Sequence, residues 1–115
     1  MKVQIIRSKA TVQQVKNMLK TLETYIKLAV DIERDIIAGG GVLHADCEAV
    51  LIDDGSQQEN IWGADWIPVS QELRFEALIN IRPTQGNKTM TIQDSKIRER
   101  IEKITRRLLG DVECG

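Results

Sequence analysis

Apolar side chains recur at helical spacing near both ends of the chain and alternate with polar side chains in much of its middle. Within each terminal stripe, most residues are three or four positions apart, which is the pattern of a helix face turned to a core. The stripes consist of Val12, Val15, Leu19, Leu22 and Ile26, and of Ile97, Ile101, Ile104 and Leu108. They predict two amphipathic helices, one from about residue 11 to 24 and one following residue 94.

Capping residues stand at the expected ends of both helices. Thr11 and Gln14 match a capping box, in which a hydroxyl and an amide side chain satisfy free N–H groups at a helix start. Asp94 can cap the second helix and Gly110 can end it. Residues 106–107 are both Arg and fall in its last turn, where the helix dipole favours cations. The starts of both helices and the end of the second are therefore predicted independently of their apolar stripes.

The segments that follow the first residues and the first helix have the pattern of strands. Residues 3–6 contain three β-branched side chains and predict a short first strand. Residues 27–33 alternate Leu, Val and Ile with Ala, Asp and Glu, as in a half-buried strand. A turn at Arg34 and Asp35 would lead back into a short partner strand at residues 36–38.

Residues 73–82 alternate most regularly of all and predict the best strand of the chain, which Pro83 would end. Residues 60–67 are expected to pair with this strand as a hairpin, with residues 68–72 as the connection. The apolar side of the strand should pack against the stripe of the last helix.

Size and composition are those of one globular domain. The chain has 115 residues, of which 42% are hydrophobic, and this is enough to bury a core without metal or disulfide links. We find no internal repeat and no linker. The prediction is a single α+β domain over residues 1–115, with a largely antiparallel sheet of four or five strands and two or three helices packed on one face.

Residues 43–52 fit two structures. Leu43, Cys47, Val50 and Leu51 have helical spacing, whereas every second residue from Ala45 would equally form one face of a strand. The Ala- and Glu-containing composition, with glycines before it and Gly55 after it, favours a short helix.

Charge is unevenly distributed although the net charge is only −1. Residues 31–65 contain nine acids and one Arg, and residues 96–107 contain six bases and two acids. A nucleic-acid domain usually has an overall basic excess and a recognisable motif, and this chain has neither. The pattern argues against nucleic-acid binding and for acids and bases that pair within the fold or across a dimer.

Cysteine usage and hydropathy indicate a cytoplasmic protein. Cys47 and Cys114 are far apart and do not make a disulfide framework, so we expect both to be free thiols. No apolar run approaches the roughly 20 residues that cross a bilayer, and we expect no membrane association.

Several spaced motifs in the middle of the chain resemble a family of small prokaryotic proteins that carry only a domain-of-unknown-function label. The motifs are Val30-Asp31-Ile32-Glu33-Arg34, Gly40-Gly41 with His44-Ala45-Asp46, Gly55-Ser56 with Gln58, Trp62-Gly63-Ala64, and Leu78-Ile79-Asn80-Ile81-Arg82-Pro83 followed by Gly86-Asn87. The resemblance runs from about residue 27 to the final helix. It implies an α+β domain from a prokaryotic cytoplasm, and it supplies no activity and no site residues. The chain has Asp35 where the family pattern leads us to expect glycine at the hairpin turn.

His44, Asp46 and Glu48 are the first candidates for a site. On a strand all three would share a face, and on a helix only His44 and Glu48 would. Imidazole and carboxylates can bind a divalent metal or perform acid–base chemistry, although no established metal-binding or catalytic motif is present. Cys47 falls in the apolar stripe in either structure and is expected to be buried and inert. Residues 39–41 are all Gly and are better suited to a tight turn than to phosphate binding.

Trp62 and Trp66 stand on either side of Asp65 and would point to the same side of a strand. Two interpretations are open. They could form a stacking wall or a partner anchor, or they could fill the edge of a core that has few other large side chains.

The polar side of the strand at residues 73–82 supplies the remaining candidates, Glu76, Asn80 and Arg82. Such planar groups suit fixed, bidentate pairing with the acids of the middle segment. We expect Arg82 and Glu76 in a charged network near His44 and one Trp, at the floor or rim of a concave surface. The network could bind a ligand or could only stabilise the fold.

The sequence does not establish an activity, and it identifies no cofactor and no metal. We interpret the chain as a non-enzymatic binding or interaction module that forms a homo-oligomer, most simply a dimer, and binds an unidentified protein or small molecule. The alternative is a small hydrolase-like or metal-dependent enzyme that uses His44 and nearby carboxylates.

Overall fold

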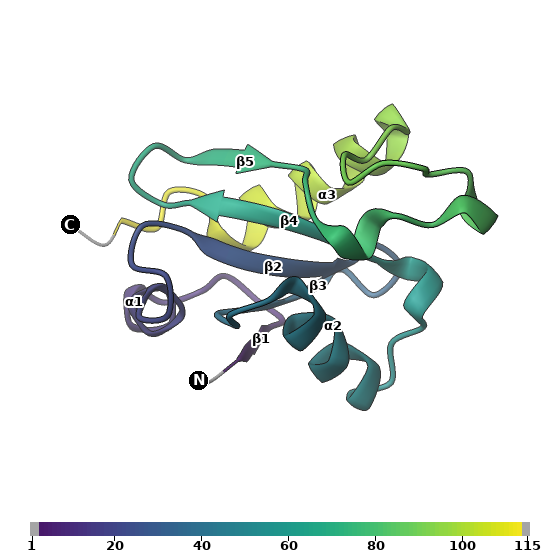
Figure 1. The fold of residues 1–115 in the computed structure, drawn as a ribbon. Helices are drawn as coiled ribbons and strands as arrows, with labels where there is room; N and C mark the ends of the chain where they lie inside the picture. The colour runs from purple at the N-terminus through teal and green to yellow at the C-terminus, as the bar shows by residue number, and fades with distance from the viewer. Residues whose placement is uncertain (1–2, 114–115) are drawn as a thin grey trace.

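A five-stranded antiparallel sheet forms the centre of the computed structural model, which describes residues 3–113 (Figure 1). The strands are β1 (Gln4–Ile6), β2 (Ile26–Asp31), β3 (Ile36–Gly39), β4 (Ile61–Ile67) and β5 (Glu72–Arg74). Their order across the sheet is β1-β3-β2-β4-β5, and every neighbouring pair is antiparallel. The predicted α+β class and the predicted sheet are confirmed.

The central hairpin joins β2 to β3 through a tight turn at residues 32–35. Asp31 makes this turn possible, because its Oδ1 accepts hydrogen bonds from the backbone N–H groups of Glu33 (2.9 Å) and Arg34 (3.0 Å). Asp35 occupies the left-handed position with φ of 57°, where glycine was expected. Asp tolerates this conformation better than most residues, so the turn forms without glycine.

Three helices cover the sheet, namely α1 (Val12–Leu19), α2 (His44–Asp53) and α3 (Ser95–Leu109). The capping box at Thr11 and the cap at Asp94 form as predicted, and Gly110 follows the last residue of α3. The helical alternative for residues 43–52 is confirmed. The first helix is shorter than predicted. It ends at Leu19, the N–H of Lys20 bonds to the carbonyl of Asn17 three residues back, and Glu23 has a positive φ of 71°.

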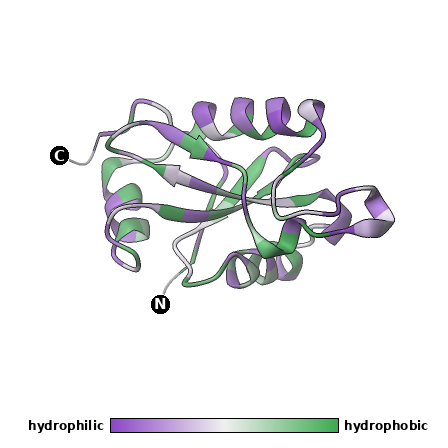
Figure 2. Ribbon diagram, turned by 45° about the horizontal axis from the view of Figure 1, so that its top comes forward, coloured by the Kyte–Doolittle hydropathy of each residue, from purple (hydrophilic) through white to green (hydrophobic). Residues whose placement is uncertain are grey.

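The expectation that all helices lie on one face is wrong. The helices α1 and α3 pack on one face of the sheet, against Leu28 and Val30 of β2, whereas α2 packs on the other face, against Ala29. The cause is that the central strands are apolar on both sides, since Ile36 and Ala38 alternate with Ile37 in β3. Both faces need cover, and Figure 2 shows helices on both sides of the sheet.

The last helix packs as predicted. Ile101, Ile104 and Leu108 are buried in the larger core, and Leu73 and Phe75 pack against it from the β5 side. Both Trp side chains of β4 lie in the same core. Among residues 3–113, no helix is long and apolar enough to cross a membrane.

The predicted long strand at residues 73–82 is wrong, because only Glu72–Arg74 pairs with β4. The hairpin between the two strands is confirmed, but the chain then turns away into the short 3-10 helices η2 (Leu78–Asn80) and η3 (Pro83–Gln85). A further 3-10 turn, η1 (Gln58–Asn60), precedes β4. The alternation of residues 73–82 therefore continues past the end of the real strand.

Candidate functional site

The part of β4 that lies beyond β5 is covered by an asparagine side chain instead of a strand. Asn80 is fully buried, and its Oδ1 accepts from the N–H of Gly63 (2.7 Å) while its Nδ2 donates to the carbonyl of Gly63 (3.0 Å). This pair of bonds has the form of a strand pairing. Gly63 is required there, because a Cβ at this position would lie 2.5 Å from the Cβ of Ala77.

A second buried amide closes the loop that follows. The Nδ2 of Asn87 donates to the carbonyls of Asn80 (2.7 Å), Thr89 and Thr91, and its Oδ1 accepts from the N–H of Gln93. Buried amide groups of this kind must be hydrogen-bonded to offset their desolvation. The two asparagines therefore fix the irregular segment between β5 and α3.

Arg82 anchors the same loop to the sheet, and its side chain is only 9% exposed. Its guanidinium donates to the carbonyls of Ile79 (2.9 Å), Gln58 (2.8 Å) and Ile61. The guanidinium carbon lies 4.7 Å from the centroid of the Trp62 ring, which is a cation–π contact. Most of the donors of Arg82 are therefore committed within the protein.

Glu48 of α2 forms an ion pair with Arg82, with 3.3 Å between Oε2 and Nη2. Burial raises the pKa of the Glu48 carboxyl, although the Arg82 charge and a hydrogen bond with Gln58 act in the opposite direction. Burial also lowers the pKa of Arg82 despite the attraction of Glu48. Desolvation thus exceeds the Coulomb attraction for both partners, which is the usual weakness of a buried ion pair.

These residues lie around a hollow that is open to solvent. Its floor carries Glu48 and Arg82, and its walls include Gln58, Leu78, Ile81 and Gln85. A concave surface at Arg82 is therefore present, but neither His44 nor a Trp lines it. Glu76 does not join this network, because it is exposed and pairs only through its backbone, with Thr91.

His44 begins α2 and points to β4. Its Nε2 lies 2.8 Å from Oδ1 of Asp65 and 3.1 Å from the carbonyl oxygen of Ala64. Asp46 caps the same helix end, since its Oδ2 accepts from the N–H of Leu43 at 3.1 Å. His44, Asp46 and Glu48 therefore each have a different partner and do not converge.

The two Trp side chains are buried, Trp62 at 2% and Trp66 at 0% exposure. This favours their interpretation as core residues. Arg106 lies over the ring of Trp66, at 5.6 Å from its centroid, so both rings carry an Arg on one side. Neither ring is available as an open stacking wall.

Cys47 is fully buried on the inner side of α2 and is a free thiol, while Cys114 lies outside the described residues. Burial raises the pKa of the Cys47 thiol to about 11, so it is protonated near neutral pH. A protonated, buried thiol does not act as a nucleophile. Within residues 3–113, no three side chains of His, Cys, Asp or Glu form a group that could hold a metal ion.

The fold and the site define a small α+β domain whose polar motifs largely fasten its own loops and helix ends. The chain belongs to the family described as "Protein of unknown function (DUF5674)", whose model matches residues 4–108. The expected membership of a family with only a domain-of-unknown-function label is thereby confirmed. A comparison with curated proteins and one with solved structures each found no match.

Sequence reasoning did not single out the outer side of α2. Ala45, Ala49 and Ile52 are exposed there, and Leu78 and Ile81 of the adjacent loop are exposed beside it. A signal was present, because positions 45, 49 and 52 share one helix face opposite to Cys47 and Leu51. This spacing indicates an exposed apolar surface only when residues 43–52 are known to form a helix and the position of the neighbouring loop is known.

Proposed function

We propose that this protein is a non-enzymatic interaction module that forms a homodimer through the outer side of α2 and the neighbouring loop. We call this surface, made of Ala45, Ala49, Ile52, Leu78 and Ile81, the α2–η2 face. The observation that carries the proposal is that these exposed side chains are apolar and lie on adjacent elements of one face.

The outer side of α2 differs from that of the other long helix. Residues on the outer side of α3 are almost all charged, as Lys96, Glu99 and Lys103 illustrate. Those of α2 are Ala45, Ala49 and Ile52 at one-turn spacing, together with Asp53 at the helix end, and the buried side of α2 is apolar as well. A helix that is apolar on opposite sides is typically covered on both. Figure 2 shows this contrast, with α2 mostly green and the outer side of α3 mostly purple.

The loop beside α2 extends the same surface. Leu78 is 71% exposed and Ile81 is 42% exposed, although both belong to a segment that buried amides hold rigidly. Both line the hollow above Glu48. In α2, Glu48 itself lies one helical turn from Ala45 and from Ile52. Contiguous exposed apolar patches usually mark interaction sites.

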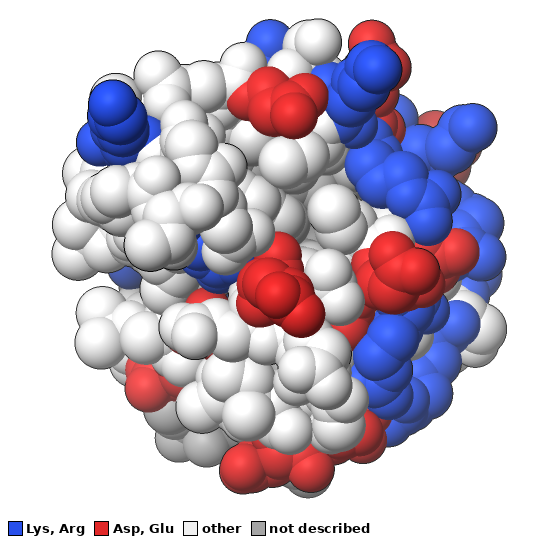
Figure 3. Space-filling model, turned by 90° about the vertical axis from the view of Figure 1, so that its right-hand side faces the viewer, with Lys and Arg blue, Asp and Glu red and all other residues white. Residues whose placement is uncertain are grey.

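Charge distribution supports the choice of this face and of a like partner. Figure 3 shows Lys and Arg gathered along the side where α3 lies, whereas the opposite side is largely uncharged. Two bases of α3 are already paired within the chain, Arg100 with Asp35 and Arg106 with Glu102. This reduces their availability for nucleic acid. The apolar side chains of the α2–η2 face can meet those of a second copy about a two-fold axis.

The enzymatic alternative has less support. It rests on the contact between His44 and Asp65, in which Nε2 is already occupied by Asp65 and a carbonyl. The nearest nucleophile in the sequence, Cys47, is buried and protonated. The free thiol of Cys47 supports a cytoplasmic location for the module.

Sedimentation velocity of three proteins tests the dimer. The wild-type chain is expected to sediment as a dimer at micromolar concentration, and Leu78→Lys combined with Ala49→Lys as a monomer. Both positions are exposed, so the substitutions should leave the fold intact, which circular dichroism checks.

Val69→Lys is the matched control, because Val69 is 93% exposed but lies in the β4–β5 turn, away from the α2–η2 face. It should remain dimeric. A wild-type monomer throughout the concentration range contradicts self-association. A dimer that persists in the double variant contradicts this choice of face.

A further inference from the structure

The structure leaves most bases of the last helix without an acidic partner. The sequence predicts that acids of residues 31–65 and bases of residues 96–107 pair within the fold or across a dimer. Six of the nine acids do have partners inside the chain, but only Asp35 has one in α3, namely Arg100 at 2.8 Å. The six acids are Asp31, Asp35, Asp46, Glu48, Asp54 and Asp65. The proposed dimer face does not include α3, so neither the fold nor the dimer matches the charges of this helix.

Four of these bases lie in a line along the outer side of α3. They are three or four positions apart, which places them on one side of the helix over about 16 Å. All four are exposed, and Figure 3 shows Lys and Arg side chains gathered on this side of the molecule. We call them the α3 basic stripe: Lys96, Arg100, Lys103 and Arg107.

Two members of the stripe are free to pair with another molecule. Within residues 3–113, the ammonium groups of Lys96 and Lys103 form no hydrogen bond and no ion pair. Arg107 donates only to the carbonyl of Asp35 (3.2 Å), and Arg100 pairs with the carboxylate of the same residue. The free charges therefore alternate along the stripe with charges that the β2–β3 turn already contacts.

Acids beside the stripe reduce its charge without cancelling it. Asp35 accepts from the stripe, and Glu99 lies one helical turn from two of its members without forming an ion pair in the described part of the chain. Glu102 is paired with Arg106, so these two charges offset each other. Glu33 is exposed in the β2–β3 turn, where the Arg that follows it carries the opposite charge. Four bases against Asp35 and Glu99 leave the stripe with an excess of two positive charges.

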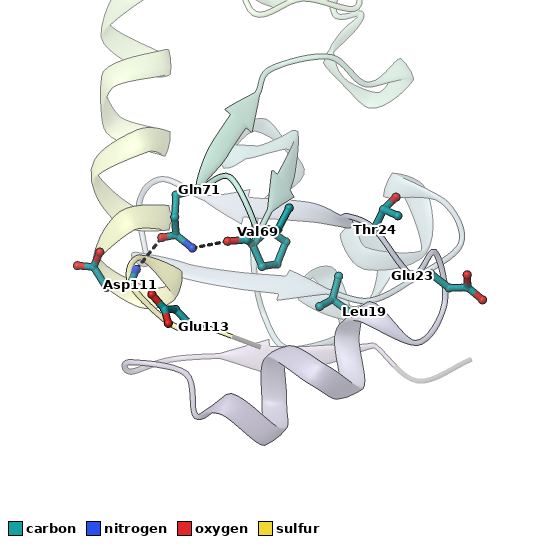
Figure 4. A pocket seen from close by; sticks show the side chains of 8 residues that line it. Leu19, Glu23, Thr24, Val69, Gln71, Asp111 and Glu113 are labelled. Carbon is teal, nitrogen blue, oxygen red and sulfur yellow. Dashed lines mark hydrogen bonds between the residues drawn. The ribbon is translucent and has the colours of Figure 1, made fainter. Parts of the chain in front are cut away.

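Hydrogen bonds at its end hold α3 in place. Gln71 of the β4–β5 turn accepts at Oε1 from the N–H of Asp111 (2.7 Å) and donates from Nε2 to the carbonyl of Pro68 (2.7 Å), as the dashed lines in Figure 4 indicate. Arg106 donates to the carbonyl of Gln71 at 3.0 Å. The helix is thereby fixed to the sheet, so a partner does not have to order it on binding.

We propose that the α3 basic stripe binds an acidic segment of another protein. Asp and Glu side chains on one side of a helix or a strand are about 5–7 Å apart, which matches the one-turn steps between the bases of the stripe. Opposite charges along such a line steer association and fix its register.

Two observations favour a peptide over a nucleic acid. The four aromatic residues of the chain are buried or half-buried, so none stands exposed beside the stripe to stack on a base. The net charge of the chain is −1, so a long polyanion that runs past the stripe would meet acids. A short acidic segment avoids this repulsion because it is confined to the stripe.

Fluorescence anisotropy of a fluorescein-labelled octaglutamate peptide, titrated with the full chain at low salt, tests the stripe. The wild type is expected to bind octaglutamate but not octaglutamine, and binding should weaken as salt is raised, because exposed charges are screened. The double variant Lys96→Gln, Lys103→Gln should bind about fivefold more weakly, since it loses two exposed ion pairs with the peptide. Both side chains are exposed and lack a partner within residues 3–113, so the fold should not change.

The matched control is Lys16→Gln, Lys20→Gln, which removes the same two charges from exposed positions at α1. It should bind like the wild type. No binding by the wild type, equal weakening in the two double variants, or tighter binding of labelled octathymidylate than of octaglutamate would each overturn the proposal. The variant Lys96→Gln, Lys103→Gln should also sediment like the wild type, because α3 lies outside the α2–η2 face. A change in its association state would assign the stripe to self-association instead of an acidic partner.

Discussion

Replacing Arg82 with methionine removes the side chain that ties the loop after β5 to the rest of the domain. Methionine can occupy the space beside Trp62 but cannot donate a hydrogen bond. The carbonyls of Ile79, Gln58 and Ile61 lose their charged donor, and the half-buried carboxylate of Glu48 loses its counter-charge. The substitution therefore tests whether Arg82 serves mainly to stabilise the fold.

The structure sets the size of the effect. Each lost bond to a buried carbonyl costs about 1 kcal/mol, and breaking a buried ion pair costs a further penalty because one charge stays behind. Three carbonyls and Glu48 together give an expected loss of about 3–5 kcal/mol. This is a large part of the 5–15 kcal/mol that typically stabilises a domain.

Urea denaturation followed by tryptophan fluorescence measures this loss directly, since Trp62 contacts Arg82. Arg74→Met is the control, because the Arg74 side chain is 61% exposed and pairs only with Glu72. The control should change the free energy of unfolding by less than about 0.5 kcal/mol. A loss below about 1 kcal/mol in Arg82→Met would refute the structural role and reopen Arg82 as a ligand-binding group.

Three further substitutions test the core, the loop and the ion pair by the same denaturation assay. Ile101→Ala should cost about 2–5 kcal/mol because Ile101 is fully buried, and a loss under about 0.5 kcal/mol would place the α3 stripe outside the core. Gly63→Ala should cost about 1–3 kcal/mol, because the new Cβ meets Ala77 at 2.5 Å, and an unchanged stability would mean that the loop does not lie against β4. For Glu48→Gln, the raised pKa of Glu48 means that its contribution to stability is greatest at low pH and is lost as pH rises through the folded-state pKa. The stability of the variant relative to the wild type should therefore increase as pH rises from the ordinary pKa of a Glu carboxyl, about 4.3, through the raised folded-state pKa, and a constant difference would contradict the shift.

Local signals predicted the elements that depend on local chemistry. The caps at Thr11 and Asp94 and the apolar stripe through Ile101 are written in neighbouring residues, and they set the start of α1 and both the start and packing of α3. The β2–β3 and β4–β5 hairpins followed from alternation and turn composition in the same way. The sheet order was not predictable from such signals, because it depends on contacts between distant segments.

Residues 73–82 show that a local alternation pattern does not predict where a strand ends. Their alternation is genuine, but it cannot reveal that Gly63 leaves room for Ala77 and that the amide of Asn80 replaces a strand pairing. Arg82 was predicted to pair with an acidic side chain, and it does pair with Glu48. Its main partners, however, are the backbone carbonyls of Ile79, Gln58 and Ile61. Backbone acceptors leave no trace in side-chain composition.

The α2 helix shows the second limit. Its sequence fits both a strand and a helix, and only the helix places Ala49 and Ile52 on an outer side opposite to Cys47. The prediction that all helices lie on one face of the sheet was wrong for a similar reason. A correct prediction required the apolar residues of β2 and β3 to be divided between the two sides of the sheet.

The central claim is that the α2–η2 face is covered by a second copy of the chain. Amide chemical shifts of uniformly ¹⁵N-labelled protein, recorded over a dilution series, test it residue by residue. The account predicts concentration-dependent shifts at residues 44–53 and 78–82, with none in the β4–β5 turn at residues 68–71. Shifts that do not change on dilution in a protein of monomer mass, or that change only along α3, would contradict it.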